Sequence, residues 1–500
     1  MSETSSAGVG LSAWGAYAPR LRLSRKAAAQ ANAWIAPGLA GKAKGERTMA
    51  NWDEDALTMA VEAARDALGP DDDRSQVGAL YFASSTAPFS DRLNAGILAS
   101  ALTLEPSTAS ADVTGSQRAG LTALAQALNA VRAGAAQTAL VAAGEHRRAR
   151  AASAQELEFG DGAAAFLVSA EDLVADYLGH GSVTADFVDH FRGADSEFDY
   201  YWEERWIRDE GIIKLVPPAI KAALAKAGVT GDQVTHFCFP CTFAGLAGNV
   251  AKASGIAAEA VRDNLAAQMG EAGSAHGLVL LAHALENAKP GDIIVAAQFG
   301  GGAEALVFRV TDKLADRRPA RGVTGALADR QEETNYLKFL FFNGLVDWDK
   351  GMRAEKDNKT ALTTLYRNSD MILGLVGGRC TETGVVQFPR TRISVAPNNP
   401  TVDTQEPYKF AERKAEVLTW SADYLTFAMA PPNHYGTIVF EGGGRIFMDI
   451  TDVEQGDVDS GLPVKMVFRL KEVDEKRGFR RYFWKATPDR SRAAKAIAAE

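Results

Sequence analysis

Residues 120–128 read GLTALAQAL, and residues 277–285 read GLVLLAHAL. The same offset of 157 residues relates VGALYFASS at 77–85 to VTHFCFPCT at 234–242. A fixed offset shared by separate segments is the signature of an internal repeat, because chance similarity between apolar stretches does not keep one spacing. We therefore expect the chain to contain two copies of one structural unit.

Both copies show the same order of predicted elements. A short apolar strand is followed by a loop of small residues, an Ala-rich helix and further strands. The strand after the helix reads TALVAAGE at 138–145 and DIIVAAQF at 292–299. Strands that alternate with helices of ten or more residues predict βαβ units. The expected fold class is α/β, with duplicated βαβαβ halves in a layered arrangement and a largely parallel sheet.

The composition is that of a globular protein. Of 500 residues, 46% are hydrophobic and 23% are charged, which excludes disordered, collagen-like and membrane classes. The formal net charge of -9 argues against nucleic-acid binding. The N-terminal residues lack a signal-peptide pattern, and no stretch approaches the roughly 18 apolar residues that span a membrane. Three cysteines are too few to staple this chain, so we expect a cytoplasmic protein.

The composition changes after Asp312. Residues 313–333 are polar and contain glycine and proline, which predicts a linker. Beyond them, strand-like runs occur at 415–430, 436–451 and 463–473, separated by turn residues. These short strands predict a small antiparallel barrel or sandwich as a further unit.

Several of these motifs together resemble the thiolase superfamily. They are the DVTGS loop at 112–116, FGDGAAAFLV at 159–168 and FGGGAEALVF at 299–308. The most similar branch contains 3-hydroxy-3-methylglutaryl-CoA synthase and the initiating ketoacyl synthases. Residues 186–206 resemble the cap segment of that synthase, and the resemblance covers residues 8 to about 312.

The last third of the chain resembles the acyl-CoA-associated OB-fold domain, a barrel preceded by a zinc ribbon. A zinc ribbon needs two Cys-x-x-Cys pairs, but Cys380 stands alone and Thr383 occupies its partner's position. We therefore expect an all-β OB-fold barrel with a degenerate ribbon that binds no metal. The expected segments are two thiolase-like halves at 1–170 and 171–312, the linker at 313–333, the ribbon and barrel at 334–488, and a tail at 489–500.

The resemblance also implies a nucleophilic cysteine at the start of a buried helix, with histidine and asparagine for proton transfer and oxyanion binding. Gln117 stands at the cysteine position, and its neighbour Ser116 is the alternative after a one-residue shift. Pro240 or Cys241 stands at the histidine position, and Glu271 replaces the asparagine. The usual thiolase mechanism is therefore not expected.

Three residues are candidate replacements for these groups. Cys241 ends a strand of the second copy and is expected to face the cleft, or else to be a buried, inert thiol. Glu271 and His276 share a Gly-rich loop that suits general acid–base catalysis, although a packing role for His276 is equally compatible. Together with Gln117 and Ser116, they form the predicted catalytic set.

Two further groups are candidate binding residues. A glycine loop beside the nucleophile position allows backbone N–H groups to approach an oxyanion. The predicted substrate-binding residues are Ser84, Gly300, Gly301 and Gly302. A basic cluster after the strand at 138–145 is predicted to meet the phosphates of coenzyme A, with a solvated loop as the alternative. It contains His146, Arg147 and Arg148.

The loops hold polar replacements rather than bulky plugs, which favours an enzyme, either an acyltransferase or a carbon–carbon lyase. The leading prediction is CoA-dependent retro-Claisen cleavage of a β-keto acid or β-ketoacyl-CoA without a cysteine acyl-enzyme. The alternatives are Claisen-type acyl-CoA condensation with Cys241 as nucleophile, decarboxylation of a β-keto acid, and a non-catalytic acyl-CoA-binding scaffold. Coenzyme A is expected as a substrate, and the resemblance implies a homodimer.

Overall fold

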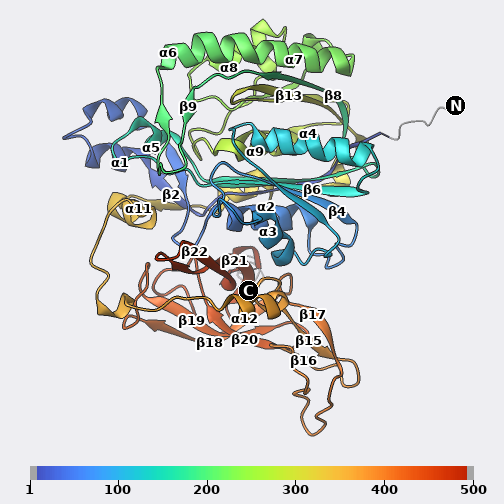
Figure 1. Ribbon diagram of the computed structural model, residues 1–500, viewed down its shortest axis with the longest axis vertical. Helices are drawn as coiled ribbons and strands as arrows, with labels where there is room; N and C mark the ends of the chain where they lie inside the picture. The colour runs from blue at the N-terminus through green and yellow to red at the C-terminus, as the bar shows by residue number, and fades with distance from the viewer. Residues whose placement is uncertain (1–7, 493–500) are drawn as a thin grey trace, which may run out of the picture.

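The computed structural model describes residues 8–492, so part of the predicted tail lies outside the described residues. In this part of the chain, nine strands of the N-terminal domain form one sheet (Figure 1). In spatial order they are β11 (His236–Cys238), β12 (Ile293–Phe299), β13 (Gly302–Val310), β8 (Ala175–Thr184), β1 (Gly10–Tyr17), β7 (Gly162–Ser169), β6 (Thr138–Glu145), β4 (Val77–Ala83) and β5 (Ala109–Val113).

The sheet is mixed. Strand β4 pairs parallel with β5 and β6, and β11 pairs parallel with β12. The other neighbours, from β12 through β13, β8, β1 and β7 to β6, pair antiparallel. The expectation of a largely parallel sheet is therefore wrong. The reason is that the last two strands of each copy form an antiparallel pair, which needs no crossover helix.

The predicted duplication corresponds to a repeat in space. The strands β4, β6 and β7 of the first copy have the same order as β11, β12 and β13 of the second. Strands β1 and β8 pair over only two residues, so the sheet divides there into two layers of strands. The repeated helices, α4 (Ala119–Arg132) and α9 (Gly273–Asn287), lie side by side between these layers (Figure 1). A Cβ atom on Gly120 would lie only 2.3 Å from the carbonyl oxygen of Ser274, so this close approach requires glycine.

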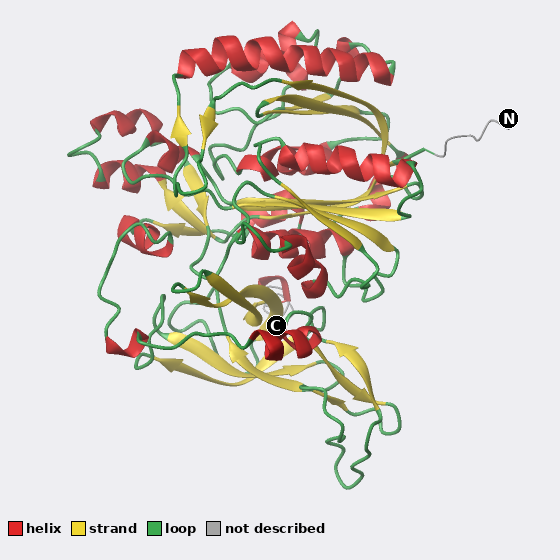
Figure 2. Ribbon diagram, viewed as in Figure 1, coloured by secondary structure: helices red, strands yellow, loops and turns green. Residues whose placement is uncertain are grey.

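Outer helices cover both layers of strands (Figure 2). On one side lie α2 (Ala56–Leu68) and α3 (Asn94–Ala101), and on the other α7 (Ile213–Ala227) and α8 (Leu246–Ala253). Between β8 and α7 the chain forms the cap, which consists of β9 (His190–Phe191), β10 (Tyr200–Tyr201) and α6 (Glu204–Trp206). The cap strands pair antiparallel as a short hairpin.

A small peripheral layer adjoins the cap. It contains β2 (Leu21–Ser24), α1 (Arg25–Ala31), β3 (Glu46–Met49), α5 (Ala154–Glu158), β14 (Gln331–Glu333) and α11 (Tyr336–Phe342). Residues 313–333, predicted as a linker, are ordered: α10 (Gly322–Ala328) packs against α9 and β1, and β14 pairs with β2. The polar composition of this segment gave no sign of its docking.

The C-terminal part of the described chain contains two antiparallel sheets. The smaller has β16 (Val386–Gln387), β15 (Val376–Cys380) and β17 (Gln405–Lys409), preceded by α12 (Leu362–Arg367) and α13 (Ser369–Ile372). The larger has β20 (Arg445–Asp449), β19 (Asn433–Phe440), β18 (Ala415–Asp423), β21 (Pro463–Asp474) and β22 (Phe479–Pro488). Antiparallel sheets are thus present here together with short helices, while barrel closure and the ribbon stay predictions.

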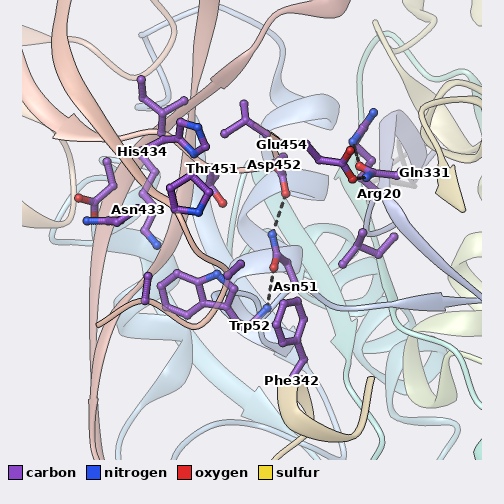
Figure 3. A pocket seen from close by; sticks show the side chains of 18 of the residues that line it. Arg20, Asn51, Trp52, Gln331, Phe342, Asn433, His434, Thr451, Asp452 and Glu454 are labelled. Atoms are coloured by element: carbon purple, nitrogen blue, oxygen red, sulfur yellow. Dashed lines mark hydrogen bonds between the residues drawn. The ribbon is translucent and has the colours of Figure 1, made fainter. Parts of the chain in front are cut away.

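Buried ion pairs join the two domains. Arg469 of β21 lies 2.9 Å from Asp452 and 3.1 Å from Glu54, and Lys485 of β22 lies 2.8 Å from Asp53. Beside this cluster is a polar cavity of about 80 Å³, where Asn51 donates a hydrogen bond to Asp452 (Figure 3). Among the described helices, none is long and apolar enough to cross a membrane.

Candidate active site

The N-termini of the two repeated helices meet around one buried carboxylate, that of Glu145 at the end of β6. Its Oε2 atom accepts hydrogen bonds from the Ser274 backbone N–H at 3.0 Å and from the Ser274 hydroxyl at 2.5 Å. The Ser85 backbone N–H also donates to Oε2 at 3.1 Å, and the hydroxyls of Thr86 and Ser84 donate to Oε1, the latter at 3.5 Å. Helix N-termini favour negative charge. Because so many donors hold this carboxylate, we assign it to organising the site rather than to moving protons.

Gln117 lies directly before α4 and points at the cap. Its Nε2 atom is 3.2 Å from Nε2 of His190 and 3.5 Å from the hydroxyl of Ser85. Its carbonyl oxygen is buried without a hydrogen-bond partner. A Cβ atom on Gly273 would lie 2.8 Å from that oxygen, so the glycine keeps room at this point. Gln117 thus brings to the meeting point of the two helices an amide nitrogen shared between His190 and Ser85 and a carbonyl oxygen without a partner.

His190 of β9 reaches this site from the cap. Its Nδ1 atom is 2.7 Å from the carboxylate of Asp189, and its ring stacks on Tyr201 with centroids 5.2 Å apart. A carboxylate only accepts hydrogen bonds, so Nδ1 carries the proton and Nε2 presents its lone pair toward Gln117. The side chain is 15% exposed. This Asp–His pair has the arrangement of a general base.

A network around Arg147 anchors the cap above the site. The buried guanidinium is 2.6 Å from Glu271 and 2.9 Å from Asp199, and it also bonds the Tyr201 hydroxyl. It lies over the ring of Phe159, 3.8 Å from the centroid. Arg147 was predicted to contact coenzyme A phosphates. Since both terminal nitrogens are already paired within the protein, the structure favours a role in positioning the Tyr201 ring against His190.

The remaining members of the predicted basic cluster lie apart from Gln117. His146 is 3.1 Å from Asp161 through Nδ1 and donates its backbone N–H to Thr86. Arg148 pairs with Glu197 and donates to the carbonyl of Gly344 at 3.2 Å. Neither contact identifies a phosphate site, so coenzyme A binding by this cluster stays a prediction.

The glycine loop lies beside the start of α4, as predicted. The carbonyl of Gly300 accepts hydrogen bonds from the Ser116 hydroxyl at 2.7 Å and from Nε of Arg118 at 3.0 Å. Gly301 and Gly302 have φ angles of +57° and +110°, which favour glycine. Ser116 is used to hold this loop and has no base beside its hydroxyl. Ser84 is buried behind Thr86, whose backbone N–H it accepts at 3.0 Å.

Cys241, Glu271 and His276 form a second neighbourhood at the start of α9. Both ring nitrogens of His276 are engaged by the backbone: Nδ1 accepts the N–H of Ala272 at 2.8 Å, and Nε2 is 2.8 Å from the carbonyl of Asn264. Burial lowers its pKa. These contacts favour the packing role that the sequence left open for His276. Burial also raises the pKa of the Cys241 thiol to about 11, which opposes a thiolate nucleophile.

His190, Asp189 and Glu145 were not among the residues predicted from the sequence. Asp189 and His190 are adjacent in the cap segment, and this carboxylate–imidazole pair is a signal that the sequence does carry. Residue spacing does not predict that His190 meets Gln117, because the two residues are 73 positions apart and the cap hairpin brings them together. Glu145 was seen only as the end of a strand.

The single cysteine of the smaller C-terminal sheet lies among hydroxyls. Sγ of Cys380 is 3.2 Å from Oγ1 of Thr401 and 3.2 Å from Oγ1 of Thr404, and it accepts the N–H of Thr383 at 3.4 Å. One thiol and three threonines supply a single sulfur donor, whereas a structural zinc site takes four nitrogen or sulfur ligands. This donor set does not fit the zinc of a ribbon.

Comparisons with known proteins agree with the N-terminal architecture. The model of the 3-oxoacyl-[acyl-carrier-protein] synthase III C-terminal family matches residues 224–310. Hydroxymethylglutaryl-CoA synthase of Methanocella arvoryzae is 27% identical over 345 residues, which cover 68% of this chain and 99% of that protein. The corresponding synthase of Thermococcus onnurineus is 28% identical over 337 residues, covering 66% and 95%.

Solved structures show the same fold. A structure described as MvaS in complex with 3-hydroxy-3-methylglutaryl coenzyme A has a TM-score of 0.57 at 19% identity, covering 68% of this chain and 92% of its own. FabH from Pseudomonas aeruginosa PAO1 has a TM-score of 0.53 at 22% identity, covering 61% and 98%.

The duplicated fold around two buried helices is similar to that of these solved structures, and residues 224–310 match the C-terminal family of 3-oxoacyl-[acyl-carrier-protein] synthase III. In sequence, the domain is similar to hydroxymethylglutaryl-CoA synthase. The predicted retro-Claisen cleavage is wrong, because the curated relatives are named as synthases, enzymes that build their product. The synthetic direction, stated as the alternative, is better supported.

Proposed function

We propose that the chain catalyses a Claisen-type condensation of acyl-CoA thioesters at the site between His190 and Gln117. The observation that carries this proposal is the Asp189–His190 pair, whose Nε2 atom accepts a hydrogen bond from the Gln117 amide at 3.2 Å. A base beside an oxyanion donor is what enolate formation next to a thioester carbonyl requires. The similarity to synthases supports the direction of the reaction.

The steps balance without a covalent enzyme intermediate. Nε2 of His190 removes an α-proton from one acyl-CoA, and the resulting enolate oxygen accepts a hydrogen bond from the Gln117 amide. The enolate carbon attacks the thioester carbonyl of a second acyl-CoA, so that a carbon–carbon bond forms. The carbon–sulfur bond then breaks, and the thiolate of coenzyme A leaves with the proton held by His190. Asp189 stabilises the imidazolium between these steps.

The simplest test follows the first step alone. We expect the protein to exchange the α-protons of acetyl-CoA for deuterium in D₂O, measured by mass spectrometry, and to form a β-ketoacyl-CoA when two acyl-CoAs are supplied. Folded protein that gives neither exchange nor product would contradict the proposal. Release of CO₂ from a β-keto acid without product formation would instead support decarboxylation.

Cys241 is expected to be dispensable for this reaction. Its thiol is buried, hydrogen-bonds toward the Phe243 carbonyl at 3.7 Å and has a pKa raised to about 11. The Cys241→Ser variant should therefore keep kcat within about threefold of the unchanged chain, whereas loss of a true covalent nucleophile typically costs several orders of magnitude. Intact-protein mass spectrometry after incubation with acyl-CoA checks the same point, since an acyl adduct on Cys241 would restore the relocated-nucleophile alternative.

We further propose that the larger C-terminal sheet closes as an OB-fold barrel. Its strand order is β20-β19-β18-β21-β22, and a parallel bridge between Ile450 and Ala486 connects the chain after β20 to the last strand. A contact between the two edges is what closure of a five-stranded barrel needs. We also propose that the chain forms a homodimer, as the family resemblance implies.

A further inference from the structure

An open aromatic groove in the cap lies next to the proposed site. It has a volume of about 260 Å³. Three of its rings are largely uncovered, with Trp202 59%, Tyr200 55% and Phe191 55% exposed. Large aromatic side chains gathered in one open groove mark a binding surface. The groove is lined by Asp186, Val188, Asp189, His190, Phe191, Tyr200, Trp202 and Trp206.

The groove and the reacting groups share His190. Its ring lines the groove, while its Nε2 atom faces Gln117. The groove wall is also held in place, because Trp206 stacks on Phe187 with centroids 5.1 Å apart and Tyr200 lies 5.4 Å from Phe191. A group bound in the groove is therefore adjacent to the base that acts on its thioester.

The charges in the groove exclude one class of acyl group. Asp186 and Asp189 are its acidic residues, and no lysine or arginine lines it. Arg192, next along the hairpin, is already paired with Asp199 at 2.7 Å and donates to the carbonyl of Ser85. An acyl chain that carries a carboxylate would find no cation here and would meet negative charge, which costs binding energy.

We propose that the groove binds a neutral aryl acyl group of the substrate, rather than a short or carboxylate-bearing one. This inference rests on the proposed function, because it takes the His190 site to be the place where the thioester reacts. The volume is sufficient, since an apolar cavity of about 150 Å³ holds a benzene ring. Trp202 and Tyr200 offer ring faces and edges on which a bound aromatic ring can stack.

The test measures binding without turnover. S-benzyl-CoA, a thioether that cannot be cleaved, is compared by calorimetry with coenzyme A and with S-(3-carboxypropyl)-CoA. We expect S-benzyl-CoA to bind at least tenfold more tightly than either of the other two. Trp202→Ala and Trp206→Ala should each remove most of this preference. The matched control is Trp34→Ala, because Trp34 is 83% exposed and does not line the groove.

Two results would overturn the inference: equal affinity for S-benzyl-CoA and coenzyme A, or a preference that survives both groove substitutions. If S-benzyl-CoA and coenzyme A bound equally well and Trp202→Ala weakened the binding of both, the groove would stack the adenine of coenzyme A instead. None of these outcomes depends on catalysis. Failure of the groove assignment is therefore distinguishable from failure of the condensation, which deuterium exchange reports separately.

Discussion

Replacing His190 by glutamine is expected to slow α-proton exchange of acetyl-CoA by a factor of about 10²–10⁴, the usual contribution of a general base. Glutamine keeps much of the size of the ring but offers no basic nitrogen. Binding of acyl-CoA should change little, because the Gln117 amide and the aromatic groove remain. The effect should therefore appear in kcat rather than in KM. Deuterium incorporation measured at saturating acetyl-CoA gives this value directly.

Two further variants separate the base from its support. Asp189→Asn keeps the geometry but removes the charge that accepts the Nδ1 proton at 2.7 Å, so it should also slow exchange, by a smaller factor. His283→Gln is the matched control, since His283 is a half-buried histidine of α9 that does not meet Gln117. If His190→Gln exchanged protons as fast as His283→Gln, another group would have to be the base.

The α/β fold of the N-terminal domain could be predicted from the sequence because the same order of strands and helices occurs twice in it. The 157-residue offset paired Gly120 with Gly277, and both glycines lie in the buried helices where a Cβ atom would collide. The repeat is periodic, so residue pattern alone carries it. The family resemblance, not the offset, implied that Gln117 lies at a helix start with the glycine loop beside it, and the structure brings these two together.

The contacts that the sequence could not predict join residues that are far apart in the chain. His190 meets Gln117 because a two-stranded hairpin folds back over the site, and no periodicity encodes that direction. The polar segment at 313–333 docks through α10, whose short Gly-containing sequence reads as a linker. In the same way, Arg469 meets Glu54 across more than 400 residues, and charge pattern does not reveal a partner at that separation.

Replacing Arg469 by leucine is expected to cost about 3–5 kcal/mol of unfolding free energy, the usual result of removing one partner from a buried ionic cluster. Arg469 is 1% exposed and faces the buried carboxylates of Asp53 and Glu54 and the partly buried one of Asp452. Without the positive charge of Arg469, these three carboxylates lie close together between the two domains and repel one another. Urea unfolding, with the exposed Arg445→Leu on β20 as control, measures the loss.

The pH dependence of this loss identifies its cause. Burial raises the pKa of Glu54 to about 7, against the opposing charge of Arg469, while Arg469 holds the pKa of Asp452 below its usual range. A raised folded-state pKa means that Glu54 favours folding when protonated, and that this contribution is lost as pH rises from about 4.5 to about 7.

Removing Arg469 raises the pKa values of both Glu54 and Asp452 further. The folded variant then binds more protons than the unchanged protein, so its penalty should be larger at pH 8 than at pH 5.5. A penalty that is equal at both pH values would mean that leucine disturbs packing alone, and a penalty as small as that of Arg445→Leu would show that the cluster does not hold the domains together.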